Sequence, residues 1–320
     1  MVAYTIKRIL GAFPLVLAVV VINFALLHLA PGDPVYVFLQ GGAGEVTEQY
    51  VQQMRRQLGL DKPLAEQLVV YVAGVLRGNL GYSHFYQSPV FQIIVERMPV
   101  TYLLVLLSTL FAAIAGIALG VSAANHPHAF VDRVCTVTAV FGYSIPVFWL
   151  GQLLIIAFSV YFSIFPTGGI PASALGQGGL LDWALHLTLP VVCLGVIQLT
   201  LVARVTRASM LEIYGMEYIV SARAKGLSNM TVTLKHSLRN AFLPIVTVIS
   251  MDFAFQIAGA MVTETVFSWP GLGRLMFDSV LRRDYPVLMG LLILTSVSVI
   301  VINLVTDIFY AYLDPRVVYQ

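Results

Sequence analysis

Long apolar stretches alternate with short polar ones along most of the chain. A helix of about 20 apolar residues spans the ~30 Å hydrocarbon core of a bilayer, and six stretches reach or approach that length. We therefore predict six transmembrane helices, at about residues 9–30, 100–124, 134–162, 187–203, 241–266 and 287–308. The third stretch is long enough to contain a kink at Pro146, and the fourth is short.

The composition agrees with a membrane protein. Hydrophobic residues make up 58% of the 320 residues, charged residues only 11%, and the mean hydropathy is +0.86. Soluble domains carry about 25% charged residues. Cys135 and Cys193 lie in apolar runs and are predicted to be buried free thiols. We predict one all-α integral membrane domain, residues 1–320, and no nucleic-acid binding, since the net charge is only +2.

The distribution of basic residues predicts the orientation in the membrane. Lys7 and Arg8 precede the first apolar run as in a signal peptide, but its length and the Pro31 that follows it favour an uncleaved helix. Cytoplasmic loops are enriched in Lys and Arg. Residues 204–240 are rich in both, whereas the short loops on the other side carry only Arg274, Arg282 and Arg283. Both termini and residues 204–240 are therefore predicted to be cytoplasmic.

The loop at residues 31–99 is predicted to be a small folded cap on the extracytoplasmic side. Apolar positions recur at helical spacing in residues 46–59 and 64–75, and Gly78 and Gly81 mark turns after them. In the second predicted span, small residues recur every four positions, which predicts a face that another helix approaches closely. They are Ser108, Ala112, Gly116 and Gly120.

The sequence contains none of the common catalytic motifs. It lacks a G-x-x-x-x-G-K-[ST] phosphate loop, and it lacks H-E-x-x-H, C-x-x-C and G-x-S-x-G. An enzyme is not indicated, and no cofactor or metal is predicted to be bound by this chain.

The cytoplasmic loop instead predicts a rigid protrusion. Residues 217–226 are typical of a helix that ends at Gly226, a position favouring left-handed backbone. Ser228 can then cap the start of a second helix, residues 229–240. Basic residues beside a membrane could simply bind anionic lipid heads. That role would need neither a glycine corner nor two capped helices.

Two segments of this loop carry a resemblance to a known family. Ala222-Arg-Ala-Lys-Gly226-Leu-Ser and His236-Ser-Leu-Arg-Asn-Ala-Phe-Leu-Pro244 resemble the coupling loop of ABC importer permeases. The likeness is greatest to the first permease subunit (dipeptide-permease B type) of the dipeptide, oligopeptide, nickel and glutathione importers. The family pattern Glu-Ala-Ala before the glycine is only partly kept, since Val220, Ser221 and Ala222 stand there.

Further segments of the family occur in order along the chain. They are Pro31-Gly-Asp-Pro34, Leu58-Gly-Leu-Asp-Lys-Pro63, Gly78-Asn-Leu-Gly81, Gly142-Tyr-Ser-Ile-Pro-Val-Phe-Trp149, Thr263-Glu-Thr-Val-Phe-Ser-Trp-Pro-Gly-Leu-Gly273 and Arg282-Arg-Asp-Tyr-Pro286. The resemblance implies a bacterial inner-membrane subunit paired with a second, homologous permease as a heterodimer. It also implies two ATP-binding subunits, which hold ATP and Mg, and an extracytoplasmic substrate-binding protein.

The resemblance also implies a role for the cytoplasmic loop. It would contact the ATPase and transmit its movement, with the cap and the Trp269 loop as docking surfaces for the binding protein. The implied coupling residues are Ala222, Arg223, Ala224, Lys225, Gly226, Leu227, His236, Arg239, Asn240 and Pro244.

A polar face of the fifth predicted span is the candidate translocation path. Asp252 lies in mid-span, where an exposed charge costs about 2.5–3.5 kcal/mol or more. Gln256, Gly259 and Thr263 share its face on a helical wheel, and Tyr143 and Pro146 of the third span are further candidates. The alternative for Asp252 is a packed interface with the second permease.

The function expected from all this is ATP-driven import of dipeptides or oligopeptides by alternating access. Import of nickel or glutathione is an alternative within the family, although no cluster of His, Cys and Asp in the spans favours a metal. A proton-coupled carrier using Asp252 is an alternative of a different class, and a non-transporting scaffold or sensor is another.

Overall fold

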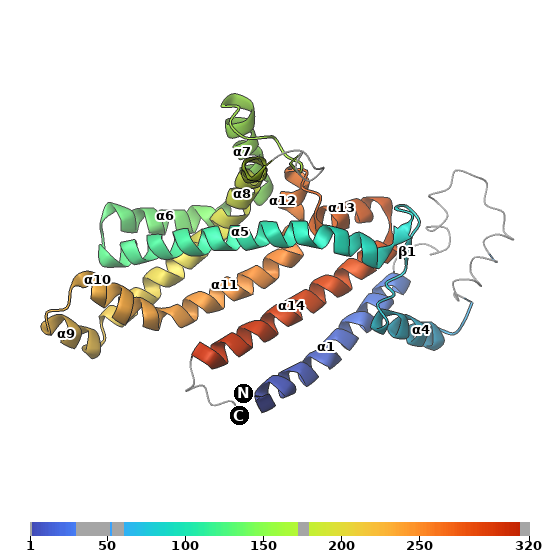
Figure 1. Cartoon of the computed structure of the whole chain (residues 1–320), viewed down its shortest axis with the longest axis horizontal. Coiled ribbons are helices and arrows are strands. Elements are labelled where there is room, and N and C mark those ends of the chain that lie inside the picture. The colour runs from blue at the N-terminus through green and yellow to red at the C-terminus, as the bar shows by residue number, and fades with distance from the viewer. Residues whose placement is uncertain (1, 30–51, 53–60, 172–178, 314–320) are drawn as a thin grey trace. The chain divides into compact units, whose positions relative to one another are not determined.

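The structure is a computed structural model that describes residues 2–29, 52, 61–171 and 179–313. These residues are mostly helical and divide into two compact units. The first unit comprises residues 1–100 and 271–301, and the second comprises residues 101–270 and 302–320. Figure 1 colours the elements from blue to red along the chain. The helix predicted at residues 46–59 lies outside the described residues, apart from position 52.

Within the described ranges, five helices are long and apolar enough to cross a membrane. They coincide with the predicted spans 1, 2, 4, 5 and 6. Four are single α-helices: α1 Val2–Leu29, α5 Val90–Asn125, α8 Leu180–Tyr214 and α14 Tyr285–Leu313. The other is the continuous helix formed by α10 Asn229–Thr231, the π-helix η3 Val232–Leu238 and α11 Arg239–Gly259.

The predicted third span is two helical segments rather than one. Helix α6 (Phe130–Ser144) ends just before Pro146, and α7 (Val147–Leu154) continues into the π-helix η1 (Ile155–Tyr161). The kink predicted at Pro146 is therefore a complete break. Proline pushes the residue before it out of the helical region, and the backbone of Pro146 itself is extended at ψ 132°.

In the first unit, the helix that follows the first span packs against it. Helix α4 (Leu64–Leu76), predicted from the apolar spacing, lies against α1. His28 Nε2 lies 3.1 Å from Gln67 Oε1, and the rings of Phe24 and Tyr71 are 5.7 Å apart. These contacts join the C-terminal end of α1 to α4.

A short hairpin and helix α13 (Leu272–Arg282) complete the first unit. Strand β1 (Tyr82–Ser83) pairs antiparallel with β2 (Ser88–Pro89). The hydroxyl of Ser83 donates to Asp284 Oδ2 at 2.5 Å, and both residues are buried. Residues 61–89 of the predicted cap form α4, turns and the hairpin, whereas residues 90–99 belong to α5. An apolar cluster in this unit consists of Val90, Ile93, Ile94, Leu272, Leu275, Val287 and Leu291.

Helix α8 is central to the second unit, where it packs against α6, α7 and α11. The stripe of small residues on α5 also faces α8. A Cβ added at Gly120 would lie 2.5 Å from the Ala203 carbonyl oxygen, and one at Gly195 would lie 2.9 Å from that of Ser108. The predicted close approach is confirmed, because neither position has room for a side chain.

The loop around Trp269 is anchored by that side chain. The Trp269 side chain is fully buried and meets the Trp183 ring edge-on at a centroid distance of 6.3 Å. Just before it, helix α12 (Met261–Val266) carries the buried Glu264, which accepts a hydrogen bond of 2.6 Å from Thr101. The indole itself is therefore covered within this chain, whereas docking of a binding protein on the surrounding loop stays a prediction.

Candidate functional site

The glycine corner predicted after the fourth span is present. Helix α9 (Glu217–Ala224) ends in two hydrogen bonds, from Gly226 N to Arg223 O at 2.9 Å and from Leu227 N to Ala222 O at 3.4 Å. This pair of bonds is a Schellman motif, which requires left-handed backbone at the glycine. Gly226 has φ +77°, so the predicted left-handed backbone at this helix end is confirmed.

Ser228 begins the second helix of the corner as predicted. Its hydroxyl oxygen accepts the Thr231 backbone N–H at 3.3 Å. The predicted end at Asn240 is wrong, because the helix runs without a break through η3 into α11. Pro244 lies inside α11 and does not end it. Membrane helices tolerate proline because local adjustments satisfy the freed backbone groups.

The start of the predicted loop also needs correction. Residues 204–214 are the last turns of α8 rather than a loop. The predicted fourth span, residues 187–203, is therefore the middle of a 35-residue helix. The apolar run ends at three charged residues, Arg204, Arg207 and Glu212, but the helix continues past them. A helix needs an apolar surface only along the part that contacts lipid. We use "the knob" below for residues 215–240.

The knob is packed firmly onto the helices that carry it. Ile219, Ala222 and Val232 are buried at the knob's inner face. They share one apolar cluster with Met210 and Ile213 of α8 and with residues of α5 and α11. Burial of side chains the size of Ile219 and Val232 stabilises the contact by about 1.5–3 kcal/mol each. The knob is thereby anchored to three helices together: α5, α8 and α11.

Polar contacts join the same elements. Asn125, the last residue of α5, accepts hydrogen bonds through Oδ1 from Tyr214 Oη and, at 3.2 Å, from Thr233 Oγ1. The Arg223 guanidinium lies 5.3 Å from the centre of the Tyr214 ring. Sequence reasoning missed Asn125, Tyr214 and Thr233. Only their positions near helix ends hint at a role, and nothing in the pattern pairs them.

The outer face of the knob is available to a partner. Of the predicted coupling residues, Arg223, Ala224, Lys225, Gly226, Leu227, Arg239, Asn240 and Pro244 are exposed, His236 is partly buried, and Ala222 is buried in the inner face. Apolar side chains lie exposed among them: Val220, Leu227, Met230 and Leu234. A cluster of exposed apolar side chains beside basic ones is typical of a protein interface.

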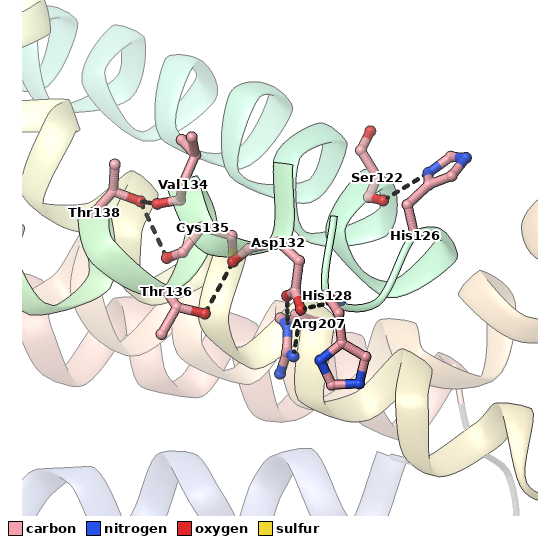
Figure 2. Close-up of polar contacts among 9 residues, drawn as sticks. All are labelled: Ser122, His126, His128, Asp132, Val134, Cys135, Thr136, Thr138 and Arg207. Carbon is pink, nitrogen blue, oxygen red and sulfur yellow. Dashed lines mark hydrogen bonds and ion pairs between the residues drawn. The ribbon is translucent and has the colours of Figure 1, made fainter. Parts of the chain in front are cut away.

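An ion pair joins α6 to α8 (Figure 2). Asp132, in the first turn of α6, accepts hydrogen bonds from the Arg207 guanidinium through both oxygens, one of them at 3.1 Å from Nη2. Asp132 Oδ2 also accepts the His128 backbone N–H at 2.9 Å. These hydrogen bonds lower the pKa of Asp132 to about 2, with Arg207 contributing most. Sequence reasoning did not find this pair.

The candidate path residues are brought together only in part. Gln256 Nε2 donates to Asp252 Oδ2 and to Gln198 Oε1 of α8, both at 3.0 Å. Gly259 is the last residue of α11, and a turn at Ala260 separates it from α12, where Thr263 is buried. The helical wheel that grouped Thr263 with Asp252 assumed one unbroken helix. Gln198 was missed by sequence reasoning.

The two candidate path residues in the third span lie at or beyond the end of helix α6. Tyr143 is near the end of α6, and Pro146 is exposed in the break before α7. Among the described residues, no three His, Cys, Asp or Glu side chains gather in a way that could hold a metal ion.

Comparison with protein families gives two matches that cover almost the whole chain. Residues 1–105 match the N-terminal region of binding-protein-dependent transport system membrane components. Residues 116–319 match the binding-protein-dependent transport system inner membrane component.

Individual relatives match over the same length. The dipeptide transport system permease protein DppB of Escherichia coli K12 is 38% identical over 99% of both chains. The glutathione transport system permease protein GsiC of Escherichia coli O6:H1 is 40% identical over 100% of both. A solved chain of the MetNI methionine ABC transporter, in an inward-facing conformation, has a TM-score of 0.56 over 70% of this chain and 97% of its own. At 19% identity, that likeness concerns the fold alone.

Proposed function

Because the chain belongs to the family of binding-protein-dependent transport system inner membrane components, we propose that it is the permease subunit of an ATP-driven importer of short peptides. The observation that carries this proposal is the knob. It is rigid, capped at Gly226 and exposed on its outer face, in a chain whose sequence has no phosphate loop. Energy must then come from a partner, and the knob offers that partner a surface.

The proposed assembly has two permeases, two ATPases and an extracytoplasmic binding protein. This multi-pass inner-membrane chain supplies one permease domain of six crossings with both termini in the cytoplasm. The third crossing in chain order, which is not among the five long helices, is proposed to be α7 with η1, an apolar segment of residues 147–161. Such a broken segment can reach across the membrane where other helices surround its free backbone groups.

In the proposed mechanism the knob works as a lever. ATP binding draws the two ATPases together and shifts each knob. The apolar cluster at Ile219 and the hydrogen bonds of Asn125 carry that shift to α5, α8 and α11. The Asp132–Arg207 pair extends it to α6. Because packed interfaces resist continuous deformation, the helices rock as rigid bodies and alternate access to the path.

The substrate proposal rests on the names of the relatives. One full-length relative is named as a dipeptide permease and another as a glutathione permease. Glutathione is itself a short peptide, so it is the second candidate substrate. Asp252, Gln256 and Gly259 of α11 are proposed to line the path, with Thr263, Tyr143 and Pro146 near it.

The test is uptake into proteoliposomes that contain the chain with its partner subunits. Peptide should accumulate only when ATP and the binding protein are present, and collapse of the proton gradient should not prevent it. Uptake that follows a proton gradient without ATP would instead support the carrier that uses Asp252.

A further inference from the structure

A small polar cluster lies between the middle of α8 and the last two turns of α11. It consists of Gln198, which is 2% exposed, Gln256, which is 7% exposed, and the partly buried Asp252. Gln256 connects the other two, because its Nε2 donates to Asp252 Oδ2 and to Gln198 Oε1. Apolar side chains flank these three residues on both helices, among them Cys193, Leu194, Val202, Ala254 and Ile257.

The hydrogen-bond directions in this cluster follow from the charge of Asp252. The carboxylate only accepts, so the Gln256 amide must turn its nitrogen toward it. That nitrogen has two N–H groups, and both are used. Reversing the amide would bring its oxygen against both Asp252 Oδ2 and Gln198 Oε1. The assignment is therefore determined by electrostatics rather than by the similar shape of the two amide ends.

Two buried polar atoms remain unpaired as a consequence. Gln256 Oε1 and Gln198 Nε2 have no hydrogen-bond partner, although both are buried. Buried polar atoms are nearly always paired, so an unpaired acceptor and an unpaired donor side by side call for an explanation. Together with the carboxylate of Asp252, the cluster offers a negative charge, one acceptor and one donor.

The amino end of an unblocked peptide has the complementary set of groups. Its terminal ammonium is positive, and its first peptide bond supplies one N–H and one C=O. Resting on the proposed function, we propose that Asp252, Gln256 and Gln198 form a transit site for the amino terminus of the cargo. Asp252 attracts the ammonium, Gln256 Oε1 accepts the peptide N–H, and Gln198 Nε2 donates to the peptide C=O.

Such a site would recognise peptides without reading their side chains. All three contacts go to groups that every unblocked peptide carries, whatever its sequence. An ion pair formed away from water is strengthened by the low dielectric constant, which offsets part of the cost of removing the ammonium from water. Only a few contacts are made, so the cargo can also leave, as transport requires.

The experiment compares a free and a blocked cargo in the assembled transporter. Uptake of a dipeptide and of its N-acetyl form is measured in proteoliposomes for wild type, Asp252→Asn and Gln198→Leu. The binding protein is the same in every sample. Its own preference for one cargo over the other therefore cancels when the uptake of each cargo by a variant is divided by the uptake of that cargo by wild type. The matched control is Thr247→Val on α11, since the Thr247 hydroxyl donates within its own helix, to Leu243 O at 2.8 Å.

We expect Asp252→Asn to lower uptake of the free dipeptide about tenfold or more, as for loss of a charge-assisted contact, and N-acetyl uptake less than twofold. Gln198→Leu should lower the uptake of both cargoes several-fold, because both contain the peptide bond that Gln198 would contact. Thr247→Val should resemble wild type. A free dipeptide with a photoreactive first residue should also cross-link near Asp252, which tests the site even if the binding protein rejects the blocked cargo.

Other outcomes would overturn the transit site. Equal loss for both cargoes in Asp252→Asn, together with dependence on a proton gradient, would make Asp252 a proton relay. Loss of the assembled complex in Asp252→Asn would make the cluster an interface with the second permease. If Asp252→Asn and Gln198→Leu took up both cargoes as wild type does, the transit site would be refuted and the proposed function would still hold. If wild type showed no ATP-driven peptide uptake, both proposals would be refuted.

Discussion

Replacing Gly226 tests the lever most directly, because the structure separates backbone strain from crowding at this position. Gly226 has φ +77°, yet a Cβ added there would meet no atom within 4 Å. A substitution therefore costs only the left-handed backbone, which is about 1–2 kcal/mol for an ordinary residue. The cost is greater for a β-branched residue and smaller for asparagine.

The expected effect follows from that magnitude. A cost of about 2 kcal/mol reduces the population of the capped corner relative to an uncapped one by up to about 30-fold. Without the Schellman bonds, the end of α9 is no longer held in one direction relative to α10. Gly226→Val should therefore lower the ratio of peptide transported to ATP hydrolysed, and the order of effect should be Val, then Ala, then Asn.

The assay measures peptide uptake and ATP hydrolysis in the same proteoliposomes. Gly215→Ala is the matched control. Gly215 is the C-cap of α8, just before α9, and its φ of −79° suits any residue. A Cβ added there would lie 3.4 Å from the nearest atom, the Glu212 carbonyl oxygen. It should couple normally. Normal coupling in Gly226→Val would refute the lever, and an Asn variant as impaired as the Val variant would show that backbone strain is not the cause.

Three further predictions concern the contacts around the knob. Tyr214→Phe removes the hydroxyl that bonds Asn125, so the same assay should show coupling reduced about fivefold with the complex assembled, as for loss of about 1 kcal/mol; full coupling would contradict this. The pKa of Asp132 is lowered to about 2, so its ion pair stabilises the fold fully above the ordinary pKa of 3.8 and loses that contribution only as pH falls toward about 2. The difference in melting temperature between wild type and Asp132→Asn should thus stay constant from pH 5 to 8, and a difference that shrinks in that range would be evidence against the pair. Gly120→Leu should destabilise the protein by about 1–3 kcal/mol or more, because its Cβ would meet a backbone oxygen at 2.5 Å, whereas Gly11→Ala, with no atom within 4 Å, should not lower the melting temperature.

The apolar runs alone determined that this is a membrane protein and where five of its long helices lie. Hydrocarbon excludes unpaired backbone groups, so a run of bilayer length must be helical whatever it packs against. Local backbone chemistry likewise determined the corner at Gly226, the cap at Ser228 and the position of the break at Pro146. Such features depend on a few neighbouring residues, and those residues are adjacent in the sequence.

The ends of the elements were less predictable. The fourth span continues to Tyr214 and the second knob helix continues through Pro244, because helices do not stop where hydrophobicity stops. The burial of Trp269 was also missed, since an aromatic residue in a predicted loop gives no sign of what covers it.

Only the tertiary structure decided which polar residues act together. Asp132 and Arg207 are 75 positions apart, Asn125 and Thr233 are 108 apart, and Gln198 and Gln256 are 58 apart. Each lies on a helix whose apolar pattern would allow many rotations and neighbours. Packing of the small-residue faces of α5 and α8 selects one arrangement, because only there can the backbones approach closely. In that arrangement the three pairs lie within hydrogen-bond distance, and Asp252 joins the proposed transit site through Gln256.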